Sequence, residues 1–194
     1  MGPRGKVSSK IGAAIGAATS LPSKASGCKR LPSTGRRVPF PMDSPRWRHL
    51  LKPGLRETIG GLLRGELPWP LLLWGAAGRG KTCAALLMVD AVPVSVYVCL
   101  DDLMEHAFDR SASIWRLTHE AMLVVVDELG TRQQDFDREY CAVKRLADLR
   151  EHRPAVWISN HGPERLRAIY DDRICSRLCC GTVVEVTGPD RRFQ

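Results

Sequence analysis

Short apolar runs alternate with longer segments of mixed polarity from about residue 46 onwards. Each run has four to six residues, and most runs are rich in Val, Ile or aromatic side chains. This length and composition are typical of strands in a parallel sheet that is buried on both faces. The pattern predicts five strands, over residues 71–74, 95–100, 122–126, 155–159 and 182–186.

Helical spacing marks several of the intervening segments. Residues 46–65 place leucines near helical spacing, although Pro53-Gly54 interrupts this segment early. Residues 136–150 carry apolar side chains three or four positions apart, and Pro163-Glu164 is typical of a helix start. Strands that alternate with helices predict an α/β domain with a parallel sheet. In such domains ligands bind at the carboxyl ends of the strands.

The loop after the first predicted strand has a phosphate-binding pattern. Residues 75–82 match Gly-x-x-x-x-Gly-Lys-Ser/Thr, and they lie between a predicted strand and a helix. Glycines let backbone N–H groups wrap around phosphate oxygens, Lys81 reaches the β- and γ-phosphates, and the Thr82 hydroxyl holds Mg²⁺. The predicted nucleotide-binding residues are Gly75, Ala76, Ala77, Gly78, Arg79, Gly80, Lys81, Thr82 and Cys83.

Two acidic residues, Asp127 and Glu128, follow the third predicted strand. In a chain with a phosphate-binding loop, Asp127 would hold Mg²⁺ through its water shell. Glu128 would orient and activate the water that attacks the γ-phosphate. Kinases of small substrates generally do not need this second acid, so the pair favours hydrolysis over phosphoryl transfer.

Polar side chains in two later segments suit the same site. Asn160, after the fourth predicted strand, could position the attacking water or touch the γ-phosphate, although asparagines commonly just form turns. Arg173 and Arg177 are four positions apart and therefore share one helix face. A pair of arginines suits recognition of a γ-phosphate, but such pairs are more commonly solvated at the surface.

Five motifs occur in a fixed order along the chain, namely 75–82, 124–130, 158–160, 172–178 and 187–192. In this order and near this spacing they resemble the AAA+ ATPases of the DnaC-type helicase-loader and IstB-type transposase-helper family. The likeness covers about residues 46–192. The phosphate-binding loop alone is generic, whereas Asp-Glu-Leu-Gly, Ser-Asn and Arg-x-x-x-Arg-Leu together are much more specific.

The resemblance implies a P-loop NTPase, a three-layer α/β/α domain with a five-stranded parallel sheet of the 5-1-4-3-2 type. It implies ATP and Mg²⁺ as cofactors, with Asn160 as the sensor-1 residue and Arg192 as a late, sensor-2-like arginine at the nucleotide. Arg177 would be an arginine finger offered to the ATP of a neighbouring subunit, with Arg173 beside it. A finger of this kind implies head-to-tail oligomers. Because eight residues follow Val186, the lid domain is expected to be missing or vestigial.

We therefore expect residues 46–194 to form a cytoplasmic ATPase that acts in DNA replication, with DNA and a replicative helicase as partners. One alternative is a transposition helper of the same type, which would act with a transposase. A second is a small P-loop kinase, because Arg-x-x-x-Arg can also form a kinase lid, although Glu128 and Asn160 argue against it. A third is an ATP-switched DNA-binding adaptor with little turnover.

The charge of the chain is concentrated in its first segment. The 194 residues carry a formal charge of +8, of which residues 1–45 supply +7 and the remainder +1. Residues 1–45 are also rich in Pro, Gly and Ser, so we predict a disordered tail. It could bind a polyanion, solubilise the protein or, despite its lack of large apolar side chains, direct targeting.

The sequence predicts no membrane partner, because no stretch approaches the roughly 18 apolar residues that cross a bilayer. Its seven cysteines form no Cys-x-x-Cys or zinc-type pattern. They are expected to be reduced thiols of a cytoplasmic protein.

Overall fold

The computed structural model describes residues 51–131 and 135–190. Its centre is a sheet of five parallel strands in the order β2-β3-β4-β1-β5. Read from the other edge this is the expected 5-1-4-3-2 order, which is thereby confirmed. The strands are β1 (Leu71–Trp74), β2 (Ser95–Cys99), β3 (Leu123–Leu129), β4 (Ala155–Ser159) and β5 (Thr182–Glu185).

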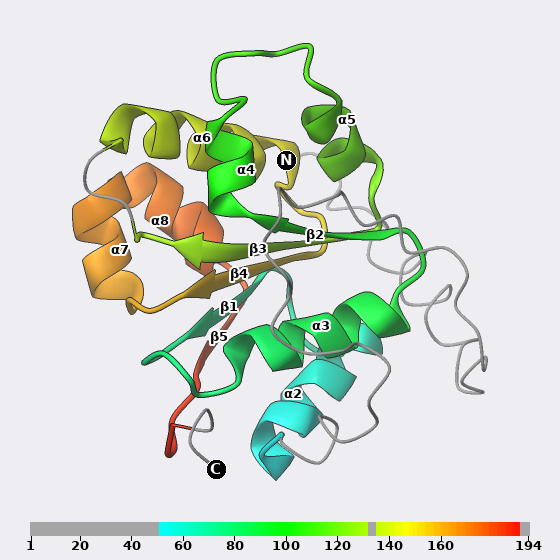
Figure 1. The fold of residues 1–194 in the computed structure, drawn as a ribbon. Coiled ribbons are helices and arrows are strands. Elements are labelled where there is room, and N and C mark those ends of the chain that lie inside the picture. Colours follow the sequence, from blue (N-terminus) through cyan, green and yellow to red (C-terminus); the bar gives the residue numbers. More distant parts are fainter. Residues whose placement is uncertain (1–50, 132–134, 191–194) are drawn as a thin grey trace, which may run out of the picture.

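Helices cover both faces of the sheet and complete the predicted three-layer α/β/α arrangement (Figure 1). On one face lie α2 (Pro53–Leu63) and α3 (Lys81–Ala91). On the other face lie α4 (Leu100–Met104), α5 (Ser113–Glu120), α6 (Phe136–Leu149), α7 (Pro163–Tyr170) and α8 (Asp172–Cys179).

Alternate strand residues enter two separate hydrophobic cores. Leu71 and Leu73 of β1 pack with α2 and α3, whereas Leu72 points into the opposite core. The same alternation runs along β3, where Leu123 and Val125 face one core and Val124 and Val126 face the other. Successive side chains of a strand point to opposite faces, so a strand that is covered on both sides must be apolar throughout. This explains the continuous apolar runs of the sequence.

Arg150, directly after α6, holds together the edge of the sheet where the strands begin. Its side chain is 2% exposed and donates hydrogen bonds to four carbonyl oxygens. These belong to Thr118, Ala121, Met122 and Pro154, at 3.2, 2.9, 3.3 and 2.5 Å. Burial lowers the pKa of Arg150 to about 9. The guanidinium therefore takes the place of water as the hydrogen-bond donor to carbonyl oxygens in the segments that precede β3 and β4.

Two boundaries differ from the prediction. Pro53 does not interrupt a helix but begins α2, because proline lacks only a donor that the first turn leaves unused. β3 continues to Leu129, so Asp127 and Glu128 lie inside the strand and not after it. The tail over residues 1–45 and Arg192 lie outside the described residues. Within the described ranges, no helix has the length and apolar character needed to span a membrane.

Candidate nucleotide-binding site

Two glycines of the loop between β1 and α3 have backbone conformations and neighbours that exclude a side chain. Gly75 has φ 138°, and a Cβ atom there would lie 2.6 Å from the carbonyl oxygen of Val186. Gly78 has φ 74°, and a Cβ atom there would overlap the carboxylate of Asp190. The loop is therefore packed closely against the segment that follows β5.

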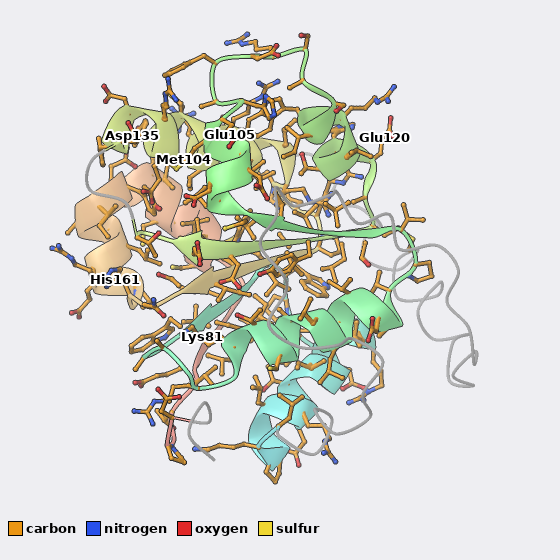
Figure 2. The ribbon with its side chains drawn as sticks, in the orientation of Figure 1. Lys81, Met104, Glu105, Glu120, Asp135 and His161 are labelled. Carbon is orange, nitrogen blue, oxygen red and sulfur yellow. The ribbon has the colours of Figure 1, made fainter. Side chains whose placement is uncertain are left out.

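Lys81 is the first residue of α3 and is 6% exposed. Its Nζ atom donates hydrogen bonds to the carbonyl oxygens of Gly75 and Ala76, at 2.6 and 2.9 Å. A third bond, of 2.9 Å, reaches Oδ1 of Asn160 at the end of β4. Figure 2 shows Lys81 at the carboxyl edge of the sheet, the edge at which His161 also lies. The ammonium group thus points into the loop and joins it to the neighbouring strand.

Thr82 and Asp127 form the second part of the site. Oδ2 of Asp127 accepts hydrogen bonds from the hydroxyls of Thr82 and Tyr97, each at 2.8 Å. The Asp127 side chain is buried, and this burial raises its pKa, although the two hydroxyl bonds oppose the shift. A hydroxyl and a carboxylate beside a phosphate-binding loop are hard oxygen donors, which is the ligand set that Mg²⁺ prefers. These residues therefore fit the predicted metal.

A bulge in β3 turns Glu128 away from the buried face. Val126 pairs with Trp157 and Leu129 with Ser159, so β3 has one more residue than β4 between these pairs. Glu128 takes up the extra length with φ 68° and is exposed. Its Oε2 accepts a hydrogen bond from Sγ of Cys99, at 3.2 Å. Bulges re-aim side chains and often lie next to active sites.

Ser159 fixes the position of Asn160 across the same bulge. Its Oγ donates to the carbonyl oxygen of Leu129 at 2.8 Å and accepts from the backbone N–H of His161 at 3.0 Å. Asn160 lies between these two anchored positions and is itself exposed. The residues on either side of Asn160 are therefore anchored, and its amide oxygen accepts the hydrogen bond from Lys81.

A buried polar network lies behind the bulge. The backbone N–H of Gly130 donates to Oε1 of Glu139 at 2.9 Å and to the hydroxyl of Tyr170 at 2.7 Å. The Tyr170 hydroxyl also donates to Glu139, which is 1% exposed. This network ties the end of β3 to α6 and α7.

The arginines of α8 do not join the other predicted site residues in this chain. Arg177 is 21% exposed and pairs with Asp148, and its Nη2 lies 3.9 Å from Glu151. Both acids lie between the last turn of α6 and the start of β4, at the edge opposite the phosphate-binding loop. Arg173 is exposed. Of the remaining predicted residues, Cys83 is half-buried in the first turn of α3.

A cleft of about 280 Å³ adjoins the phosphate-binding loop at Arg79. Lys52 bridges it by a 3.4 Å hydrogen bond from Nζ to Oγ1 of Thr187. No local sequence pattern marks this cleft, because its walls come mostly from segments near the two ends of the described chain, with Arg79 of the loop between them. They are formed by Leu51, Lys52, Gly54, Leu55, Arg79, Val184, Glu185, Val186 and Thr187.

No family model and no curated protein sequence matches this chain. Solved structures do match it. A DNA replication initiation factor aligns over 77% of this chain and 49% of its own, with 20% identity and a TM-score of 0.55. The replication initiator DnaA bound to AMPPCP and single-stranded DNA aligns over 77% and 53%, with 19% identity and a TM-score of 0.54.

The structure of the DnaC helicase loader aligns over 74% of this chain and 100% of its own, with 13% identity and a TM-score of 0.57. The fold is shared. This chain has the P-loop NTPase fold of these replication proteins, as the motifs led us to expect. It spans about half the length of the initiation factor and of DnaA.

Proposed function

We propose that the protein is a MgATP-binding and hydrolysing ATPase of the DnaC-like AAA+ type that acts in DNA replication. The main support is the placement of two hydrogen-bonded pairs, Lys81 with Asn160 and Thr82 with Asp127, at the start of α3 and the ends of β3 and β4. Both pairs lie at the carboxyl edge of a parallel sheet, in a fold shared with replication proteins, one of them bound to AMPPCP.

Nucleotide binding would exchange protein acceptors for phosphate oxygens. The Lys81 ammonium is already held against the loop by carbonyl oxygens, so β- and γ-phosphate oxygens can replace them without a new side-chain conformation. The backbone N–H groups of the loop and of the start of α3 supply further donors. The cleft between α2 and β5, which adjoins the loop at Arg79, would receive the nucleoside.

Hydrolysis would depend on the two acids of β3. Thr82 and Asp127 would hold Mg²⁺, which neutralises charge on the β- and γ-phosphates when it is bound. Glu128 is exposed at the same edge, where it can take a proton from water as that water attacks the γ-phosphate. Asn160 would orient the water or contact the γ-phosphate. The position of Glu128 supports hydrolysis over transfer to a small substrate.

Arg177 would complete the site of a neighbouring subunit. Its pairing with Asp148 and Glu151 puts it at the edge opposite its own phosphate-binding loop, so it suits a nucleotide held by another copy. Head-to-tail assembly would follow from such a contact.

DNA and a replicative helicase are the partners that we propose. The support is the basic segment 1–45 and the likeness to an initiator bound to single-stranded DNA and to a helicase loader. Deleting residues 1–45 should lower DNA affinity and flatten its dependence on salt, because fewer phosphate counterions are released. An unchanged salt slope in fluorescence-anisotropy titrations would remove this segment from DNA binding.

The Glu128→Gln substitution tests the central proposal. Binding of a fluorescent ATP analogue should be retained, while phosphate release should fall on the order of a hundredfold because the general base is gone. Glu120→Gln, at the end of α5, is the matched control and should hydrolyse ATP like the wild type. Unchanged turnover in Glu128→Gln would exclude Glu128 as the base, and absence of ATP binding by the wild type would refute the whole proposal.

A further inference from the structure

Beside the proposed Mg²⁺ residues, three side chains of different chemistry converge at the ends of β2 and β3. Cys99, Asp101 and Glu128 each offer one ligand atom, and these atoms all lie within 4.8 Å of one another. We propose that they bind a thiophilic divalent cation of the Zn²⁺ type, and that this cation inhibits the ATPase by occupying Glu128. The inhibition rests on the proposed function, whereas the binding does not.

Two of the ligands stand on adjacent paired strands, and the third stands on the helix that follows one of them directly. Cys99 ends β2 and pairs in register with Asp127 of β3. Glu128 follows in the bulge, and its left-handed backbone conformation turns its carboxylate to the Cys99 thiol, at 3.2 Å. Asp101 lies in the first turn of α4, which begins directly after Cys99. A site on such elements is held more exactly than a site on loops.

The distances suit a small tetrahedral ion. With Zn–S of about 2.3 Å and Zn–O of about 2.1 Å, ligand atoms lie about 3.5 Å apart. The Cys99–Glu128 pair is already close to that spacing, and the others need to approach by at most about 1.3 Å. Three protein ligands leave one position for water. The thiol proton passes to solvent as the metal binds.

The donor types distinguish this site from the one that Thr82 and Asp127 form. Thr82 and Asp127 offer only hard oxygen donors, which favour Mg²⁺. A thiolate with two carboxylates favours a softer ion of the Zn²⁺ kind. Each ion can therefore select its own site, although the two sites are adjacent.

Metal binding at Glu128 would have a specific kinetic effect. A carboxylate that ligates Zn²⁺ cannot accept a proton from water, so turnover should fall. Lys81, Thr82 and the cleft remain available to the nucleotide. Zn²⁺ should therefore lower kcat on the order of a hundredfold and leave the KM for ATP unchanged.

The test uses the full chain, stripped of metal, and Co²⁺ as a spectroscopic substitute for Zn²⁺. One equivalent of Co²⁺ should produce cobalt–thiolate absorption, which Zn²⁺ then removes. This absorption should be lost in Cys99→Ser, be weakened in Asp101→Asn, and persist in Cys180→Ser, whose thiol is exposed elsewhere. Circular dichroism identifies any variant that does not fold, and Asp101→Asn replaces Cys99→Ser if that variant fails.

The inhibition is tested by measuring ATP turnover with Zn²⁺ added in the presence of excess Mg²⁺. Each variant is compared with its own turnover in the absence of Zn²⁺. Zn²⁺ should inhibit the wild type and Cys180→Ser but not Cys99→Ser. Cobalt absorption that is absent, or unchanged in Cys99→Ser, overturns the site whether or not the protein hydrolyses ATP. Binding without inhibition overturns the regulatory role. If the wild type hydrolyses no ATP, the proposed function fails while the cobalt result still decides the metal site.

Discussion

The two edges of the sheet each contain a buried cation that donates to backbone carbonyl oxygens, yet the surroundings of the two cations differ. Lys81 at the carboxyl edge binds carbonyls of a loop whose residues Ala76 and Ala77 are exposed. Arg150 at the opposite edge binds four carbonyls from segments packed inside the fold. The chemistry of the contacts is the same, and only the surroundings of the acceptors differ.

This difference shows when a buried charge is available for function. Of the two carbonyls that hold Lys81, the one of Ala76 belongs to an exposed residue, so water can replace the ammonium there at little cost, and phosphate oxygens can replace the carbonyls as acceptors for the ammonium. The carbonyls around Arg150 have no such substitute, and removing a buried donor leaves its acceptors unsatisfied. Burial and hydrogen bonding alone therefore do not separate a binding residue from a structural one.

Lys81→Ala should weaken ATP binding on the order of a hundredfold or more, because two charge-assisted hydrogen bonds to phosphate are lost. The midpoint of thermal unfolding without nucleotide should change little. Binding is measured with a fluorescent analogue and unfolding by calorimetry, with Lys144→Ala on α6 as control. Wild-type affinity for ATP in Lys81→Ala would contradict the assignment of the phosphate-binding loop. A large loss of stability would show that Lys81 supports the fold, as we expect of Arg150.

Arg150→Met should show the reverse pattern. Four buried carbonyls would lose their donor, so the free energy of unfolding should fall by about 3 kcal/mol. This corresponds to a decrease of about 6–12 °C in Tm. Arg116→Met, exposed on α5, is the control for loss of a surface charge. An Arg150 variant of normal stability would show that water reaches these carbonyls.

The Arg177→Ala substitution tests whether the edge of the sheet opposite the phosphate-binding loop also has a role in catalysis. If Arg177 acts on the nucleotide of a neighbouring copy, turnover should fall about tenfold or more at concentrations where subunits associate. In dilute monomer the variant and the wild type should be equal. Phosphate release is measured across protein concentration, with Arg165→Ala on α7 as control. An equal defect at every concentration would refute action between subunits.

The Asp127→Asn substitution should have opposite effects on turnover and on stability at the carboxyl edge of the sheet. Burial raises the pKa of Asp127, so its ionised form destabilises the fold above that pKa. The variant should therefore unfold at a higher temperature than the wild type at pH 7, while Mg²⁺-dependent turnover is lost. The stability difference should shrink as pH falls through the pKa of Asp127, where the wild-type carboxyl is neutral too. A difference that is constant down to about pH 4 would contradict this explanation.

The sequence predicted the strands well because both faces of this sheet are covered. Continuous burial requires apolar residues at every position of a strand, which leaves a clear signal along β3 and β4. The order of the strands is not a local property. It followed from the resemblance of the motifs, and the structure confirms it.

The rest of the candidate site depends on neighbours in space. Tyr97 and Cys99 join Asp127 and Glu128 only because β2 and β3 are adjacent, which no local pattern indicates. The bulge at Glu128 adds one residue to an otherwise regular strand and leaves no mark in the apolar periodicity. The five-residue helix α4 is also too short to show a helical period. Arg177 was predicted to act between subunits, and its contacts within one chain leave that prediction open.

The close packing of Gly75 and Gly78 against the segment after β5 has a consequence for the rate of nucleotide exchange. Because the Asp190 carboxylate lies against Gly78, we expect this anionic side chain to repel an incoming phosphate group until it has moved aside. Such an opening step would precede binding and would not involve nucleotide. The observed association rate should therefore level off at high ATP concentration, at a value set by the movement of residues 187–190 and not by diffusion.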